Sequence, residues 1–270
     1  MKVAFQGEPG AYSEEAIIHH WREKAQPIPR PYLLDVFETV ERGEADVGLV
    51  AVENSIEGSV VRTFDLLNER SLRAQGETVL RVLHCLIVNH GVKESAIRRV
   101  FSHPQALGQS RDYLERHGYE PVSFYDTAGS VRHIRDNKLM DAAAIASARA
   151  AAVYDMDILV RGLENHSENY TRFLIVGKDQ PKPTGRDKTS IAFIVAHRPG
   201  ALFNALGALA ENGINMMKIE SRPLIGSPWE YIFFIDFEGH VEDEKVVKAM
   251  DELRGHTKYM KHLGSYPSAQ

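Results

Sequence analysis

Short apolar segments alternate with helix-like segments through the first 160 residues, and this alternation restricts the fold more than any other feature. Strands that alternate with helices favour parallel sheets covered by helices. We expect strands at residues 3–5, 46–52, 80–88, 99–101, 120–124, 142–146 and 157–160. We expect helices at residues 14–22, 35–42, 59–70, 104–117, 127–137 and 147–154, the first two capped by Ser13 and Asp35.

A polar segment with two prolines and a glycine, residues 178–188, predicts a linker. A smaller unit follows it. The expected strands are residues 189–196, 214–221, 231–237 and 257–263, and the expected helices are 201–212 and 243–254. The resulting order, β-α-β-β-α-β, is the ferredoxin-like pattern.

The composition places the chain among ordinary globular proteins. Its 270 residues suffice for one large or two ordinary domains. A net charge of −5 supplies no basic field for nucleic acid. The single cysteine, Cys85, lies in an apolar run and is interpreted as a buried inert thiol. The sequence shows no signal-peptide pattern and no apolar run long enough to span a membrane. We therefore expect a cytoplasmic protein that binds neither membrane nor nucleic acid.

A polar stretch, residues 164–173, runs directly into the apolar segment 174–177, which has the character of a buried strand. The stretch therefore places three functional groups at the start of a rigid strand: the hydroxyl of Thr171, the guanidinium of Arg172 and the aromatic ring of Phe173. Taken alone, the stretch is more typical of an ordinary loop entering a strand, with Thr171 and Arg172 solvated.

Five motifs in a fixed order give the stretch more weight. They are Phe5-Gln6-Gly7-Glu8-Pro9-Gly10-Ala11-Tyr12-Ser13, Glu53-Asn54-Ser55-Ile56-Glu57-Gly58, Ser102-His103-Pro104-Gln105 with Gln109, Thr171-Arg172-Phe173, and Gly200-Ala201-Leu202 with Glu220-Ser221-Arg222-Pro223. The first four resemble the signature of the prephenate dehydratases, and the last resembles a phenylalanine-responsive ACT domain. Because the dehydratase-like sequence begins at Val3, in the strand before the first motif, we expect a monofunctional enzyme without a fused chorismate mutase.

The resemblance implies an α/β fold with two domains. Residues 1–180 would form a two-lobed catalytic domain like the periplasmic binding proteins, with one lobe from about 1–75 and 161–180 and the other from about 80–160. Residues 189–266 would form the ferredoxin-like ACT domain. The implied reaction converts prephenate to phenylpyruvate with loss of water and carbon dioxide, and it needs no cofactor and no metal.

The resemblance also implies the site. Thr171 would donate to the departing hydroxyl, Asn54 would orient the substrate, and Ser102 and Gln109 would act as neutral donors. The implied substrate-binding residues are Ala11, Tyr12, Ser13, Glu53, Ser55, Gly58, Asn165, Arg172 and Phe173. An ionised Glu53 would repel a dianion, so a supporting role is preferred for it. Arg172 is interpreted either as a carboxylate ligand or as a structural ion pair.

His103 is equally consistent with a catalytic role and with a helix cap. The other eleven histidines have no comparable context, so we expect surface groups there.

L-Phenylalanine is the implied effector, bound by Gly200, Ala201, Leu202, Asn215, Glu220 and Ser221. A glycine at a helix start admits a ligand to the backbone, and the helix N-terminus favours its carboxylate. We expect a dimer through the ACT domains, with L-phenylalanine bound at its interface, and, from this dimer, a homotetramer.

Two alternatives stay open. Arogenate dehydratase differs only in its substrate, which carries an amino group in place of the keto group. A non-enzymatic amino-acid sensor would use the same cleft for binding alone. A DNA-binding regulator is disfavoured because no basic recognition helix is evident.

Overall fold

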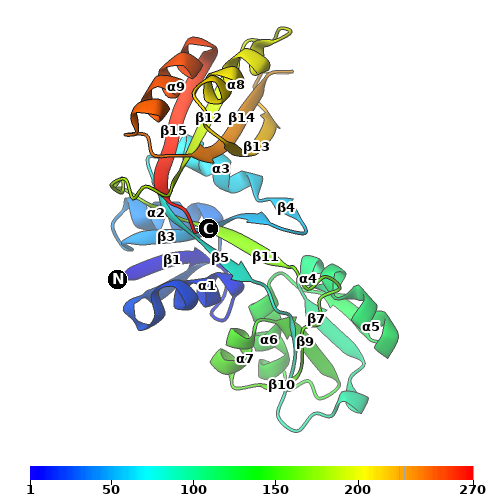
Figure 1. The fold of residues 1–270 in the computed structure, drawn as a ribbon. Helices are drawn as coiled ribbons and strands as arrows, with labels where there is room; N and C mark the ends of the chain where they lie inside the picture. The colour runs from blue at the N-terminus through cyan, green and yellow to red at the C-terminus, as the bar shows by residue number, and fades with distance from the viewer. Residues whose placement is uncertain (225, 228, 270) are drawn as a thin grey trace. The chain divides into compact units, whose positions relative to one another are not determined.

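The computed structural model describes residues 1–224, 226–227 and 229–269. The chain divides into two compact units, one of residues 1–58 and 79–173 and the other of residues 59–78 and 174–270 (Figure 1). None of the helices in this described part of the chain has the length and apolar character needed to span a lipid bilayer.

Two sheets carry most of the first unit. The first sheet has the order β2 (Gln26–Arg30), β1 (Lys2–Gln6), β3 (Val47–Asn54), β11 (Tyr170–Gly177) and β5 (Arg73–Arg81), with β4 (Gly58–Ser59) paired to β3. The division between the units passes through β5 and β11. The second sheet has the order β10 (Asp157–Arg161), β6 (Cys85–Val88), β9 (Ala142–Ala146), β7 (Arg99–Ser102) and β8 (Glu120–Ser123). The predicted alternation is confirmed, because β1 pairs in parallel with β2 and β3, and β7 with β8 and β9.

Helices follow the strands as the sequence predicts. They are α1 (Tyr12–Trp21), α2 (Leu33–Glu41), α4 (Pro104–Gln109), α5 (Arg111–His117), α6 (Thr127–Asp136) and α7 (Ala148–Tyr154), with short 3-10 turns at Arg22–Lys24 and Glu94–Ala96. The single helix expected at residues 104–117 is wrong, because the chain breaks at Ser110 into α4 and α5.

Both expected N-caps are wrong. Ala11 precedes α1, and Tyr32 precedes α2. Asp35 lies one turn inside α2, and its carboxylate accepts the backbone N–H of Tyr32 at 3.3 Å. Asp35 therefore occupies the third helical position of a capping box, where its carboxylate satisfies the backbone N–H of the residue that caps the helix.

Two strand predictions also need correction. The single strand expected at residues 80–88 is two strands, β5 and β6, because residues 82–84 leave the ladder. Strand β2 was not predicted from the sequence, because its Pro27 and Pro29 cannot donate ladder hydrogen bonds. A strand of this kind is tolerated at an edge, and β2 is the first strand of its sheet.

The ferredoxin-like pattern is confirmed in the second unit. Its elements are β12 (Asp187–Val195), α8 (Ala201–Glu211), β13 (Met216–Pro223), β14 (Tyr231–Glu238), α9 (Glu244–Gly255) and β15 (Thr257–Pro267), and the sheet order is β13-β14-β12-β15. Figure 1 shows α8 and α9 beside this sheet. They pack on alternate strand residues, among them Ile191, Phe193, Ile235 and Phe237.

The opposite face of this sheet holds α3 (Val61–Glu69). Successive side chains of a strand point to opposite faces, so Phe234 lies on this side, between Ile235 and Phe233 in sequence. Its ring centroid is 5.5 Å from that of Phe64 in α3. The helix therefore belongs to the core of the second unit, although it follows the Glu53–Gly58 motif directly in the chain.

A buried ion pair joins β5 to β12 within the second unit. Lys188 Nζ donates to Glu77 Oε1 at 2.7 Å, and the two side chains are 6% and 1% exposed. The same carboxylate oxygen accepts the backbone N–H of Ala269 at 2.9 Å. Removing one member of such a pair is costly, because the remaining charge stays buried with neither water nor its ionic partner to stabilise it.

We predict that Lys188→Met lowers the free energy of unfolding by about 3–5 kcal/mol, since Glu77 would stay buried without its cation. Urea denaturation measures the change. Lys245→Met, which removes an exposed lysine of the same unit, is the control and should change stability by less than about 0.5 kcal/mol. A loss below 1 kcal/mol in Lys188→Met would contradict the assignment.

Candidate active site

A cavity of about 180 Å³ lies in the first unit where β3, β11, α1 and α4 meet. Its lining includes six of the residues predicted for the site: Tyr12, Ser13, Asn54, Gln109, Thr171 and Phe173. It also includes Ala51, Val82, His84, His103, Gln105, Ala106 and Thr127. The structure thus brings residues that are up to 161 positions apart to one small, largely uncharged space.

Asn54, the last residue of β3, organises one wall. Its Nδ2 donates to Asn169 Oδ1 at 2.8 Å and to Thr171 Oγ1 at 3.0 Å. Its Oδ1 accepts the backbone N–H groups of Ile56 and Glu57, each at 3.0 Å. One buried amide therefore folds the loop after β3 and fixes the Thr171 hydroxyl at the start of β11.

The hydrogen bonds continue from Asn169 across the cavity. Asn169 Nδ2 donates to Gln109 Oε1 at 2.9 Å, and His84 Nε2 lies 2.9 Å from the same oxygen. Gln109 Nε2 donates to Glu57 Oε1 at 3.1 Å. On the far side of the imidazole, Tyr12 Oη lies 2.6 Å from His84 Nδ1.

The hydrogen-bond partners of the two ring nitrogens assign the tautomer of His84. Gln109 Oε1 can only accept, so His84 Nε2 must carry a proton, and Nδ1 then accepts from the Tyr12 hydroxyl. Burial lowers the pKa of His84 below its ordinary value, only partly offset by the bond to Gln109, so the ring is neutral. Burial also raises the pKa of Tyr12 well above its ordinary value, so its hydroxyl keeps its proton.

Three further groups of this network, His84, Asn169 and the carboxylate of Glu57, were not predicted from the sequence. The expectation that eleven histidines are surface groups is wrong for His84, which is 2% exposed, and for the fully buried His240. His84 is the only polar side chain besides Cys85 in the apolar run 82–88, and this position could have indicated a buried functional group. Asn169 directly precedes Tyr170 and Thr171, so its position beside the motif could have suggested it.

Three predicted site residues make structural contacts. Ser55 Oγ donates to the Glu168 carbonyl at 2.8 Å, which ties the loop to the start of β11. Ser102 is fully buried, and its Oγ donates to the Ile145 carbonyl at 2.6 Å. Asn165 accepts the backbone N–H of Asp112 and donates its own to Gln109 O. Their contact with a substrate stays a prediction.

Arg172 follows Thr171 on β11 and lies 3.8 Å from Glu53, with its side chain 14% exposed. This arrangement favours the structural ion pair over the carboxylate ligand. Ala11 is buried at the start of α1, and Gly58 is exposed with a φ of +83°. Neither of these two residues is among those that line the cavity.

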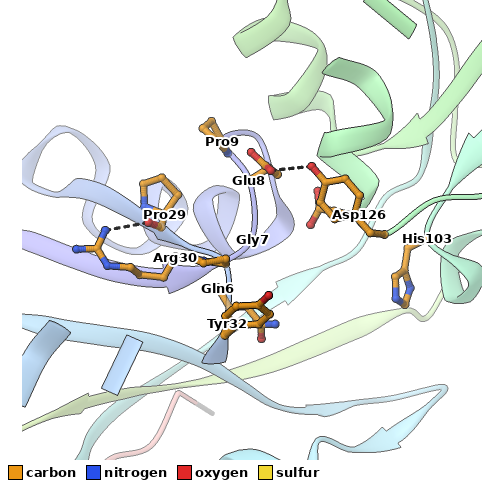
Figure 2. Close-up of a pocket in the computed structure, with 11 residues that line it drawn as sticks. Gln6, Gly7, Glu8, Pro9, Pro29, Arg30, Tyr32, His103 and Asp126 are labelled. Carbon is orange, nitrogen blue, oxygen red and sulfur yellow. Dashed lines mark hydrogen bonds between the residues drawn. The ribbon is translucent and has the colours of Figure 1, made fainter. Parts of the chain in front are cut away.

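A second, larger cavity of about 570 Å³ shares His103 with the first. Figure 2 shows Glu8 extending toward the segment that carries Asp126, with its bond to Tyr125 drawn. The Glu8 carboxylate also accepts two bonds from Arg132, at 2.8 and 3.0 Å. His103 caps α4 by accepting the N–H of Gln105, so the cap interpretation is confirmed while the ring still faces both cavities.

The predicted effector residues lie in the second unit. Gly200 precedes α8 with a φ of +79°, and the space where a Cβ would stand is open. A small cavity of about 140 Å³ beside it is lined by Ala201 and Leu202. Asn215 donates to Glu238, and Glu220 accepts from Ser59.

Within the described residues, no group of three or more His, Cys, Asp or Glu side chains could hold a metal ion. The interpretation of Cys85 as a buried inert thiol is confirmed, because it is fully buried and burial raises its pKa to about 11.

Two family models match the sequence of this chain, one over the first part and one over the second. The family model described as prephenate dehydratase matches residues 3–181, and the model of the ACT domain matches residues 189–255. The chain belongs to the prephenate dehydratase family. A bifunctional chorismate mutase/prephenate dehydratase from Aquifex aeolicus is 40% identical over 272 residues, which cover 100% of this chain and 74% of the relative.

Two solved structures similar to this chain have the same fold. A prephenate dehydratase from Arthrobacter aurescens, solved in complex with L-Phe, is 31% identical with a TM-score of 0.91, over 99% of this chain and 90% of its own. A protein described as GqqA, a novel type of quorum quenching acylase, is 36% identical with a TM-score of 0.93, over 100% and 98%. The predicted α/β class with a ferredoxin-like ACT domain is therefore confirmed.

We predict that His84 is neutral, carries its proton on Nε2, and titrates below its ordinary value of 6.5. The ring stays neutral because burial disfavours the charged form, so acidification through the lowered pKa should break the bond from Tyr12. Imidazole ¹⁵N chemical shifts measured against pH, with His84→Gln for assignment, test this. A proton on Nδ1 or a midpoint above 6.5 would contradict the assigned tautomer.

Proposed function

We propose that the cavity converts prephenate to phenylpyruvate, with carbon dioxide and water as the other products. The observation that carries the proposal is the bond from Asn54 Nδ2 to Thr171 Oγ1 at 3.0 Å. Because Oγ1 accepts a hydrogen bond from the Asn54 amide, the hydroxyl of Thr171 can direct its own proton to a substrate group. Membership of the prephenate dehydratase family supports the same reaction.

The reaction breaks two bonds of the substrate ring. The bond to the ring carboxylate breaks, its electron pair enters the ring, and carbon dioxide leaves. The carbon–oxygen bond opposite breaks as the ring becomes aromatic, and the oxygen leaves as water after taking a proton. The Thr171 hydroxyl gives its proton to this oxygen in the transition state, where a positioned donor contributes ~10²–10⁴-fold. Threonine then regains a proton from solvent, so that each turnover consumes one proton.

The remaining polar groups hold this arrangement before the substrate arrives. Asn169 is fully buried and Asn54 and Gln109 nearly so, which fixes their side-chain amides in one direction of donation. A preorganised set of dipoles does not have to reorient as charge moves in the ring. Neutral Tyr12 and His84 complete this wall without adding a charge near a dianionic substrate.

Arogenate stays the alternative substrate. Turnover of prephenate and arogenate, measured side by side at equal concentration, decides between them. The acylase description of one structural relative adds a third assay, for acylase activity. The cavity hydroxyl that pairs with an imidazole is that of Tyr12, whose raised pKa makes it a poor nucleophile, so we expect no hydrolysis.

We predict that Thr171→Val lowers kcat by ~10²–10⁴-fold, because valine keeps the shape and removes the donor. Thr171→Ser keeps a hydroxyl and is the matched control, with an expected kcat within about tenfold of the wild type. The appearance of phenylpyruvate measures both. If Thr171→Val retains more than about a tenth of the wild-type kcat, Thr171 is not the donor.

We also propose that L-phenylalanine binds beside α8 and inhibits, and that residues 189–266 form a dimer. The open position at Gly200 and the neighbouring cavity support the site. The exposed side chains of Phe203, Met217 and Ile219 support a pairing surface. A homotetramer, a cytoplasmic location and the domain bounds 1–180 and 189–266 are further parts of this proposal.

We predict that calorimetry detects L-phenylalanine binding to the wild type and that Gly200→Val weakens it at least about tenfold. A β-branched residue strains the left-handed backbone at this position and fills the open space. Gly207→Ala, within the same helix, is the control and should bind normally. Equal binding by the wild type and Gly200→Val would place the effector elsewhere.

A further inference from the structure

Three charged side chains of β13 lie on one face of the strand. Lys218, Glu220 and Arg222 alternate with exposed residues, as the period of a strand requires. Glu220 pairs in register with Phe234, which contacts α3. An edge strand therefore directs a row of charges toward the segment that begins α3, all within the second unit.

Ser59 is held between two of these charges. Its Oγ donates to Glu220 Oε2 at 2.6 Å and accepts from Lys218 Nζ at 2.7 Å. Lys218 Nζ also lies 5.5 Å from the ring centroid of Phe64. Arg222 forms an ion pair with Asp65, whose side chain is 9% exposed. The start of α3 is thus fixed to β13 by hydrogen bonds, an ion pair and an aromatic contact.

The other end of α3 is held separately. Lys261 Nζ donates to the carbonyls of Leu67, Asn68 and Arg70 at 3.0, 2.7 and 2.7 Å. Tyr259 Oη donates to Asn68 Oδ1 at 2.9 Å. With both ends held, α3 must move with the C-terminal sheet as one body.

The chain before Ser59 leads directly to the catalytic loop. Asn54 Oδ1 binds the N–H groups of Ile56 and Glu57, so residues 54–57 form one closed turn. Glu57 in turn accepts from Gln109. Only Gly58 separates this turn from Ser59, so a displacement of Ser59 has one residue in which to be absorbed.

We propose that the contacts of Ser59 with Lys218 and Glu220, together with Arg222–Asp65, are a regulatory link that transmits the effector state of the ACT domain to the turn at Asn54. The link rests on the proposed dehydratase activity and its inhibition by L-phenylalanine. Glu220 has a place in both parts, as a proposed effector ligand and as the acceptor of the Ser59 hydroxyl. A displacement of β13 on effector binding moves Lys218, Glu220 and Arg222 with the strand, and it therefore shifts Ser59 and the start of α3.

Ser59→Ala tests the link, with Asp65→Asn as a second variant at the ion pair. We expect L-phenylalanine to bind Ser59→Ala within about threefold of the wild type in calorimetry, while its inhibition of prephenate turnover falls at least about fivefold, within the usual range of coupling between sites. Asn68→Ala is the matched control, because it removes a contact between the same helix and the same sheet at the end away from the catalytic loop. It should remain fully inhibited.

The outcomes separate the proposals. Full inhibition of both Ser59→Ala and Asp65→Asn, or equal loss of inhibition in Asn68→Ala, overturns the link. A wild type that turns over prephenate and ignores L-phenylalanine also overturns it as a regulatory device. Absence of prephenate turnover contradicts the proposed function instead. Amide hydrogen exchange at residues 54–57 then decides the link alone, since it should rise severalfold in Ser59→Ala and stay unchanged in Asn68→Ala.

Discussion

The side-chain amide of Asn54 is the interaction on which the site depends. One carbonyl oxygen and one NH₂ group close the turn after β3, hold Asn169, and direct the Thr171 hydroxyl. An aspartate could accept from the turn but could not donate to Thr171. A buried amide with all its partners present has a single orientation, which is why the hydroxyl it serves also has one.

The network that spreads from this amide is directional and nearly free of charge. Gln109 receives bonds from Asn169 and His84 and passes one to Glu57, which lies in the turn that Asn54 closes. The ring of partners is therefore closed on itself, and a change at one member alters the others. Neutral donors suit a substrate with two carboxylates, because they polarise a leaving oxygen without competing for an ionic partner.

Much of this protein was predictable from local pattern. Strand and helix alternation predicted the α/β class, and residues predicted for the site at the end of β3 and the start of β11 line one cavity. The misses have local causes: Pro27 and Pro29 hid an edge strand, and residues 82–84 interrupt an apolar run that has the length of one strand. His84 was missed because an apolar neighbourhood favours a packing role, and only its partners Tyr12 and Gln109, 72 and 25 positions away, identify it.

The sequence by itself determined the order of the elements, the motifs of the family and the chemical character of the groups at the strand ends. These depend on residues near one another in the chain, where periodicity and turn chemistry act. The tertiary structure decided which hydroxyls are used by the sheet, as in Ser102, and which remain available, as in Thr171. It also decided that Ser59, just beyond a catalytic motif, is bound by β13 some 160 residues later. Hydrogen bonds between distant residues form only once the fold has brought both partners out of water, so local pattern carries no signal for them.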